Sequence, residues 1–201
     1  LHSIREVEKM QTLFSSSSVD FINNPIDLCW HNKHSYPNST AFHHDIKYAG
    51  KNSTIKIKEI QENLNTTPID FYLLSSLDSI AWLLNIRGND IKNTPVLCCY
   101  AIIPNQGKIE LFINSKIIHL MRDFVNLINF HPLENIDEFI STIDNKKIFG
   151  MDENYTPYHF KNLCIKNHIF TYNFENPCLY PKAVKNVTEI NGAKNANIRD
   201  G

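Results

Sequence analysis

Two short apolar runs restrict the fold of this chain more than any other feature of its sequence. Ile69–Leu74 is almost wholly apolar, and Val96–Ile103 is rich in residues that favour β-strands. A run like the first is typical of a strand that is covered on both faces, because a strand with one solvated face alternates apolar and polar residues. The sequence therefore predicts a sheet that lies between two layers of helices.

The segments around these runs have the periodicity of amphipathic helices or of further strands. Helices are predicted at Ile4–Phe14, Ile55–Leu64, Asp78–Ile86, His119–Ile128, Leu133–Ile143 and Pro157–Lys166. Further strands are predicted at Ile109–Ile113, Lys147–Gly150 and Ile169–Tyr172, the first in a hairpin with Val96–Ile103. Helices that alternate with short strands, one pair of which is antiparallel, predict an α/β fold with three layers (α/β/α) and a mixed sheet over about residues 46–179.

Leu77–Asp90 is the most individual stretch of the sequence. Ser75 or Ser76 can cap the start of its helix, and Asp78 favours the positive end of the helix dipole. Gly88 is predicted to end the helix in the left-handed conformation, with Arg87 beside the last carbonyl groups. Ser53 or Thr54 is predicted to cap the preceding helix.

Composition excludes several classes of partner. The 201 residues have a formal net charge of -1, which offers no basic surface for nucleic acid or an anionic membrane. No apolar stretch approaches the roughly 20 residues of a membrane span. Five cysteines, two of them adjacent in an apolar run, predict free thiols in a reducing cytoplasm. Leu1 and the periodic segment that reaches Gly201 suggest that both ends continue in a longer protein.

Four histidines near one another in the sequence raise the hypothesis of a catalytic metal site. His31, His34, His43 and His44 lie close together in the sequence, but they fall in a polar, proline-containing linker. No cysteine or carboxylate stands at a regular ligand spacing beside them. Solvated linker histidines are therefore favoured, and an independent metal-dependent hydrolase is the lowest-ranked hypothesis.

The sequence also gives little support to two other catalytic hypotheses, a thiol nucleophile and a two-metal nuclease. A thiol nucleophile at Cys98 or Cys99 needs a neighbouring base or cation, whereas a position within a predicted strand favours core packing. A two-metal nuclease needs acids on adjacent strands, but only Asp70 lies on one, since Asp78 and Asp90 flank a helix. Common enzyme motifs such as H-E-x-x-H, G-x-S-x-G and the Walker loop are absent from the sequence.

Four segments carry a resemblance to one enzyme family. LDSIAWLLNIRGND at Leu77–Asp90, followed by NTPVLCCYAII, resembles the middle domain of Xaa-Pro aminopeptidases. KYAG at Lys47–Gly50 and NPIDLCW at Asn24–Trp30 extend the resemblance towards the N-terminus, and Lys182–Gly201 resembles the family's entry into its catalytic domain.

The resemblance implies a fold and a division into domains. It implies a creatinase N-terminal, ribonuclease H-like middle domain at residues 45–180, preceded by the tail of a first domain and a linker at 1–44. Residues 181–201 would begin the first helix of a catalytic domain. In this family a C-terminal "pita-bread" domain holds two divalent ions, usually manganese, with two aspartates, a histidine and two glutamates. None of those ligand motifs can be matched here, so no catalytic or metal-binding residue is assigned.

The resemblance also implies a role for the chain within a larger enzyme. The parent would remove an N-terminal residue that precedes proline, and this module would pack against the catalytic domain, shape access to its cleft and help orient subunits of a homodimer. Arg87 and Asp90 are the candidates for a contact with substrate or with another domain. The alternative is a stand-alone peptide-binding or interaction protein with the same fold.

Overall fold

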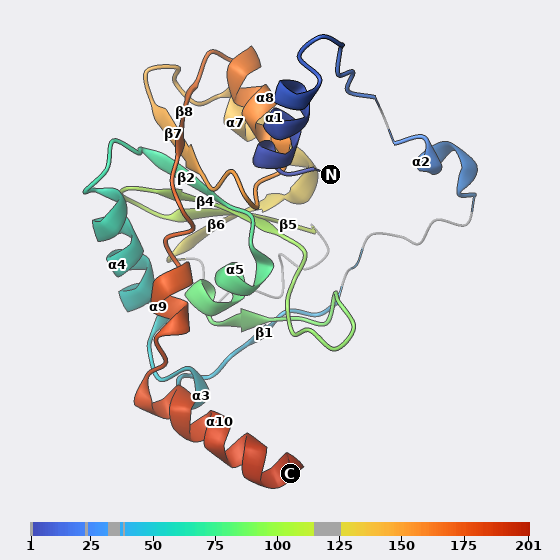
Figure 1. The fold of residues 1–201 in the computed structure, drawn as a ribbon. Helices are drawn as coiled ribbons and strands as arrows, with labels where there is room; N and C mark the ends of the chain where they lie inside the picture. The colour runs from blue at the N-terminus through green and yellow to red at the C-terminus, as the bar shows by residue number, and fades with distance from the viewer. Residues whose placement is uncertain (1, 23, 32–36, 38, 115–125) are drawn as a thin grey trace.

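A mixed β-sheet forms the centre of the computed structural model, which describes residues 2–22, 24–31, 37, 39–114 and 126–201. In the described residues the sheet has six strands in the order β6-β5-β4-β2-β7-β8 (Figure 1). The strands are β2 (Phe71–Leu74), β4 (Tyr100–Pro104), β5 (Ile109–Ile113), β6 (Ile128–Pro132), β7 (Ile148–Met151) and β8 (Phe170–Asn173). The hairpin of β4 and β5 is confirmed, as is the predicted strand at Ile109–Ile113.

Strand directions confirm that the sheet is mixed. β4 is antiparallel to both β2 and β5, whereas β2 pairs with β7, β7 with β8 and β5 with β6 in parallel. Leu73 and Leu74 on β2 are each 1% exposed. The central position of β2 therefore explains why its sequence is apolar on both faces.

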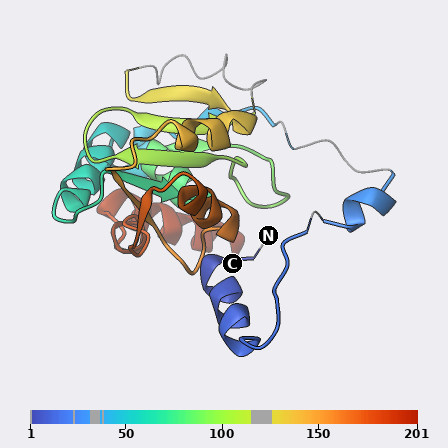
Figure 2. The same ribbon diagram turned by 90° about the horizontal axis from the view of Figure 1, so that it is seen from above.

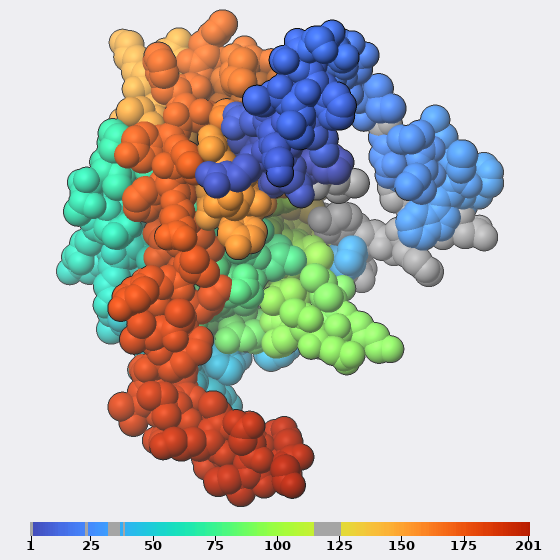
Figure 3. All heavy atoms as spheres, in the orientation of Figure 1, coloured from blue at the N-terminus to red at the C-terminus, as the bar shows by residue number. Residues whose placement is uncertain are grey.

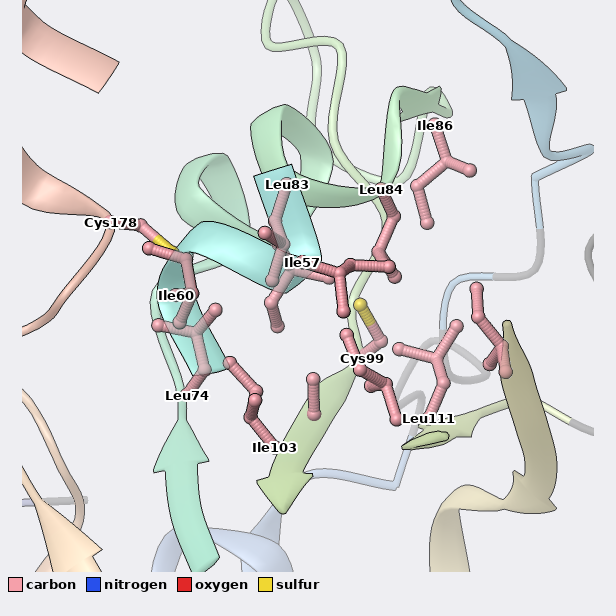
Figure 4. Packing of buried hydrophobic residues seen from close by; sticks show 14 of the residues in the cluster. Ile57, Ile60, Leu74, Leu83, Leu84, Ile86, Cys99, Ile103, Leu111 and Cys178 are labelled. Atoms are coloured by element: carbon pink, nitrogen blue, oxygen red, sulfur yellow. The ribbon is translucent and has the colours of Figure 1, made fainter. Parts of the chain in front are cut away.

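Helices cover both faces of the sheet. One face carries α1 (Ile4–Leu13), α7 (Ile136–Ser141) and α8 (Tyr158–Lys166), and the other carries α4 (Ser53–Leu64), α5 (Leu77–Leu84) and α9 (Leu179–Ala183) (Figures 1 and 2). Each face has its own hydrophobic cluster, one containing Phe149 and Phe160 and the other Ile60 and Leu83. Figure 4 shows the second cluster, in which side chains of α4 and α5 meet those of β2 and β4. The predicted three-layer α/β/α fold is confirmed.

The edge strand β6 was not predicted from the sequence. The helix predicted at His119–Ile128 lies mostly in residues that the structure does not describe, but Ile128 begins β6. Along β6 only Ile128 is fully buried, while Asn129 is exposed and the next three residues are partly exposed. An edge strand needs no continuous apolar run, which is why periodicity did not reveal it.

The start of α4 also differs from the prediction. Asn52 caps it by accepting a hydrogen bond from the Thr54 backbone NH at 2.9 Å, so Ser53 is already inside the helix. The buried stripe contains Lys56, which is 1% exposed, whereas Ile55 is 51% exposed. The first turn of α4 therefore buries Lys56 and leaves Ile55 half exposed.

The helix α1 is attached to the α/β body. Ser3 and Glu6 form a capping box, and the Ile4 NH donates a hydrogen bond to the Thr156 carbonyl oxygen at 3.0 Å. Ile4 is fully buried, and Lys161 of α8 reaches Glu8 at 2.5 Å. The apolar residues at its C-terminal end are exposed: Met10, Leu13 and Phe14.

Two helices end the chain. α9 packs near α5, and α10 (Val187–Asp200) stands out from the rest of the surface, as Figure 3 shows. A capping box of Asn186 and Glu189 starts α10. Within the described parts of the chain, none of the helices combines the length and apolarity that crossing a membrane requires.

Candidate functional site

A groove between α10 and the body of the molecule contains one of the predicted site residues, Arg87. Its walls are α3 (Ile46–Ala49) and β3 (Ile86–Arg87) on one side and α10 on the other, and its volume is about 830 Å³. We name it the junction groove. Its charged and aromatic lining residues are His44, Lys47, Tyr48, Arg87, Glu189 and Arg199.

The end of α5 directs the chain into this groove. Asn85 takes the left-handed conformation with φ 52°, so the helix ends at Leu84. The prediction that Gly88 ends α5 in the left-handed conformation is therefore wrong. Asparagine can also adopt this conformation when its side-chain amide makes local hydrogen bonds. Gly88 is needed for a different reason, since a Cβ there would lie 2.2 Å from Leu97 Cδ2.

Arg87 lies half-buried at the base of the junction groove. Its guanidinium group donates hydrogen bonds to the carbonyl oxygens of Ala81 at 2.7 Å and Ile86 at 2.9 Å. These bonds confirm that it lies beside the last carbonyl groups of α5. Burial lowers the pKa of Arg87, and Glu189 opposes this effect without forming an ion pair within the described residues. The guanidinium group has lost part of its hydration, and Glu189 offsets only part of that loss. Such a group is suited to bind an anionic group.

Asp90 has a different environment from Arg87. Its carboxylate accepts hydrogen bonds from the backbone NH groups of Ser39 at 2.9 Å and Cys98 at 2.7 Å. The Ser39 hydroxyl in turn accepts a hydrogen bond from the Asn89 NH at 2.8 Å. Asp90 is not among the described residues that line the junction groove. The structure therefore does not bring the two candidates together, and Asp90 fastens the loop that follows Arg87.

The adjacent cysteines lie just before β4 rather than within it. The predicted strand from Val96 starts too early, because the Cys98 NH is bonded to Asp90 and not to a neighbouring strand. Cys99 is 3% exposed, and burial raises the pKa of its thiol. The interpretation of Cys99 as a core residue is confirmed, since a buried thiol of raised pKa is a poor nucleophile.

The aspartates that were considered for a two-metal site each have a separate structural partner. Asp70 accepts hydrogen bonds from Lys147 Nζ and from the Ile148 NH, both at 2.9 Å, and thereby joins β2 to β7. Asp78 forms an ion pair with Lys182, which joins α5 to α9. These aspartates and Asp90 therefore stabilise three different contacts.

The linker histidines are spread over different elements. His31 is exposed after α2 (Ile26–Cys29), His43 lies on β1 (Phe42–His43) and His44 lines the junction groove; His34 is outside the described residues. Across the described ranges, no three His, Cys, Asp or Glu side chains are grouped so that they could hold a metal ion.

The start of α10 is fixed to the body by close packing and hydrogen bonds. Asn186, the cap of α10, donates from Nδ2 to the Ala49 carbonyl oxygen at 2.9 Å. Gly50 has φ 68°, and a Cβ there would lie 2.3 Å from Asn186 Oδ1. Lys182 adds a hydrogen bond to the Ser79 hydroxyl at 3.1 Å. The direction of α10 relative to the sheet is thus set by several independent contacts.

Sequence reasoning missed Lys56, which lies beneath this region. Its Nζ donates hydrogen bonds to the Trp82 carbonyl oxygen and to Asn85 Oδ1, both at 2.8 Å. The spacing of Lys56 from Ile60 and Leu64 places all three on one helical stripe. That spacing was the sequence feature that could have indicated the burial of Lys56. A lysine on an apolar stripe, however, is ordinarily expected to extend its ammonium group to solvent.

The fold is an α/β domain whose mixed sheet lies between two layers of helices, and α10 forms one wall of a surface groove. The sequence of residues 32–189 matches the Creatinase/Prolidase N-terminal domain, and the chain belongs to this family.

Two relatives of this chain are considerably longer than it is. It is 35% identical over 169 residues to Xaa-Pro aminopeptidase 1 of Dictyostelium discoideum, covering 82% of this chain and 26% of that protein. It is 29% identical over 191 residues to a probable Xaa-Pro aminopeptidase P of Laccaria bicolor, covering 92% of this chain and 30% of that protein. The chain thus spans about a quarter to a third of the length of these relatives, and the predicted family resemblance is confirmed.

Solved structures show the same fold. X-prolyl aminopeptidase from Caenorhabditis elegans, described as a cytosolic enzyme with a di-nuclear active site, superposes with a TM-score of 0.85 at 21% identity. The superposition covers 100% of this chain and 34% of the nematode protein. Prolidase from Pyrococcus horikoshii superposes with a TM-score of 0.50 at 19% identity, covering 68% of this chain and 37% of that enzyme.

Proposed function

We propose that this chain is the non-catalytic α/β module of an Xaa-Pro aminopeptidase and that it contacts the metallopeptidase domain through the junction groove and α10. The observation that carries this proposal is α10 itself. It is fixed at its start by Asn186, yet Val187 is 74% and Ile198 81% exposed on the projecting helix. Exposed apolar residues on a firmly positioned helix are suited to an interface with another domain.

The chemistry of the proposed parent enzyme belongs outside this chain. It would remove an N-terminal residue that precedes proline, with a water molecule activated by two divalent ions, which we expect to be manganese. The described residues do not fit such a centre, because they lack a cluster of three metal-ligating side chains. We therefore assign this chain neither a catalytic residue nor a cofactor of its own.

The domain boundaries remain part of the proposal. Residues 45–180 form the middle domain, residues 1–44 the tail of a first domain with its linker, and residues 181–201 the entry into the catalytic domain. The capping box that starts α10 supports the last boundary. The packing of α1 on α8 supports a close association between the N-terminal segment and the middle domain.

Further expectations concern the setting of the whole enzyme. We expect it to act in the cytoplasm, as the nematode relative is described as cytosolic, and to form a homodimer. Neither nucleic acid nor a membrane is expected as a partner, since the net charge is -1.

The two candidate residues have different proposed roles. Arg87 makes the direct contact, because it faces the junction groove and is only partly compensated by Glu189. Asp90 acts indirectly, because its two hydrogen bonds hold the loop that follows Arg87. We expect the group that meets Arg87 to be a carboxylate of the metallopeptidase domain or of the peptide substrate.

A chimera tests the role of Arg87. In the Dictyostelium relative, the segment that matches this chain is replaced by this chain, and hydrolysis of an Xaa-Pro peptide is measured with Mn²⁺. Arg87→Ala is expected to lower kcat/KM by roughly 10- to 100-fold, because a hydrogen bond to a charged group contributes about 1.5–3 kcal/mol. Arg87→Lys should lose less, since it keeps the charge.

The control is Arg5→Ala, which removes an exposed arginine from α1 on the other side of the sheet. This variant should retain full activity. If Arg87→Ala also hydrolyses the peptide at the parental rate, the proposed contact through Arg87 is wrong. A chimera that folds but has no activity would instead favour a stand-alone peptide-binding or interaction protein.

A further inference from the structure

A buried lysine lies behind the junction groove, and the proposed function does not account for it. Lys56 on α4 is 1% exposed, and its Nζ lies 4.4 Å from the centre of the Trp82 ring. No ion pair joins it to a carboxylate in the part of the chain that the structure describes. A buried ammonium group is destabilising unless hydrogen bonds compensate it, and apolar side chains of similar size often stabilise such a position better.

The contacts of Lys56 are concentrated at one place, the end of α5. Its two hydrogen bonds reach the Trp82 carbonyl oxygen and Asn85 Oδ1, both at 2.8 Å. A cation at this end is favoured by the helix dipole. Asn85 completes the arrangement by donating from Nδ2 to the Lys51 carbonyl oxygen at 2.9 Å. The side chain of Asn85 is therefore held on both sides in its left-handed conformation.

The conformation of Asn85 determines where the following residues lie. Its carbonyl oxygen accepts a hydrogen bond from the His44 NH at 2.7 Å. The next two residues form β3, in which Ile86 is paired with His43 and Arg87 with Phe42. Arg87 reaches the base of the junction groove from this short ribbon.

We propose that Lys56 is a positioning residue, which holds Asn85 in its left-handed conformation and thereby places Arg87 in the junction groove. The inference deepens the proposed function, because the importance of Arg87 rests on that function, but the placement of Arg87 can be measured without any partner domain. Lys56 itself is buried and is not among the described residues that line the junction groove.

The placement of Arg87 can be observed in the 201-residue chain by NMR. The Nη1–H signal of Arg87, whose group donates both hydrogen bonds, is assigned in the parent and in Lys56→Met, which keeps the length of the side chain but removes the Nζ donor. We expect this signal to shift and its hydrogen exchange to accelerate, because the bonds from Arg87 to Ala81 and Ile86 are lost. Lys58→Met is the matched control, since Lys58 lies on the same helix with a side chain that is 78% exposed.

A second variant keeps the test decisive if Lys56→Met fails to fold. Asn85→Gly allows the left-handed conformation but removes the acceptor for Lys56 and the donor to Lys51. It should move the Arg87 signal in the same way. If the Arg87 signal and its exchange rate are unchanged in either folded variant, Lys56 is only a structural residue and the inference is wrong.

The pH dependence of stability is an additional readout of the buried charge. Burial lowers the pKa of Lys56 to about 8, with smaller contributions in the same direction from Arg87 and Lys51 and in the opposite direction from Glu189 and Cys178. The unfolded chain binds this proton more tightly than the folded chain, so the contribution of Lys56 to stability should increase from about pH 8 to about pH 10.5. The urea midpoint of the parent should rise over this interval relative to that of Lys56→Met.

The chimeric enzyme then separates positioning from a general loss of stability. At a temperature where all variants are folded, Lys56→Met should lower kcat/KM in the same direction as Arg87→Ala. The double variant should be no worse than Arg87→Ala alone, because Lys56 acts through Arg87. Losses that multiply would overturn the inference. If Arg87→Ala has no effect on activity but Lys56→Met still moves the NMR signal, the positioning is correct and the proposed function of Arg87 is the part that fails.

Discussion

Replacement of Phe149 by alanine is expected to lower the free energy of unfolding by about 3–5 kcal/mol. Phe149 lies on β7, an interior strand between β2 and β8, and is fully buried. Its side chain belongs to the cluster that joins the sheet to α1, α7 and α8. Truncation would remove apolar contact and leave a cavity that neighbouring strands can only partly fill. A domain with a total stability of roughly 5–15 kcal/mol would lose a large fraction of it.

A matched control for this prediction lies on the next strand. Phe170 on β8 is 72% exposed, so Phe170→Ala should change the free energy of unfolding by at most about 0.5 kcal/mol. Urea unfolding followed by circular dichroism measures both variants. Equal effects of the two substitutions would contradict the assignment of β7 as an interior strand and β8 as an edge strand.

Substitution of Gly50 by alanine is expected to detach the start of α10 from the body. The residue has φ 68°, a conformation that costs an L-residue about 1–2 kcal/mol. In addition, the new Cβ would lie 2.8 Å from Thr188 Cβ as well as against Asn186. The bond from Asn186 to Ala49 should break, and amides of the first turns of α10 should exchange with solvent more than tenfold faster, which corresponds to about 1.4 kcal/mol.

Gly107→Ala is the control for Gly50→Ala, because it introduces backbone strain without a steric clash. Gly107 also has a positive φ, of 103°, but no atom lies within 4 Å of the position that a Cβ would take there. Its substitution should destabilise the β4–β5 turn without changing exchange in α10. If Gly50→Ala leaves the exchange of α10 unchanged, this helix is not fixed to the body at Gly50.

The interior of the fold was predictable because burial there leaves a direct pattern in the sequence. Ile69–Leu74 and Ile109–Ile113 are mostly apolar where strands are covered on both faces, and β2 and β5 lie within these segments. Pro157–Lys166 has the periodicity of a helix with one buried face, and α8 fills it almost completely. These elements are local consequences of the hydrophobic pattern.

The parts that were not predictable depend on contacts between distant residues. The helix α5 ends at Leu84, and the side-chain amide of the following Asn85 is hydrogen-bonded to Lys56 and Lys51, which are far from it in the sequence. β6 forms because β5 offers it a parallel neighbour, although its own residues are mostly polar or partly exposed. Local rules favoured Gly88 and a helix in these two places, and tertiary contacts overrode them.

The candidate site was only partly predictable for the same reason. The sequence indicated Arg87 as a residue beside the end of a helix, which the structure confirms. It could not indicate that Asp90, three residues later, is bonded to Ser39 and Cys98 instead of facing the same groove. The wall that α10 provides is also remote in the sequence, so the groove itself required the structure.

We propose that this chain is an accessory module and that its parent enzyme performs its chemistry in another domain. The most direct test of this proposal is hydrolysis of an Xaa-Pro peptide with Mn²⁺, measured for the 201-residue chain alone and for the Dictyostelium chimera that contains it. We expect the chimera to release the N-terminal residue and the chain alone to release none. Hydrolysis by the chain alone would contradict the account, because it would place an active site among residues to which we assign none.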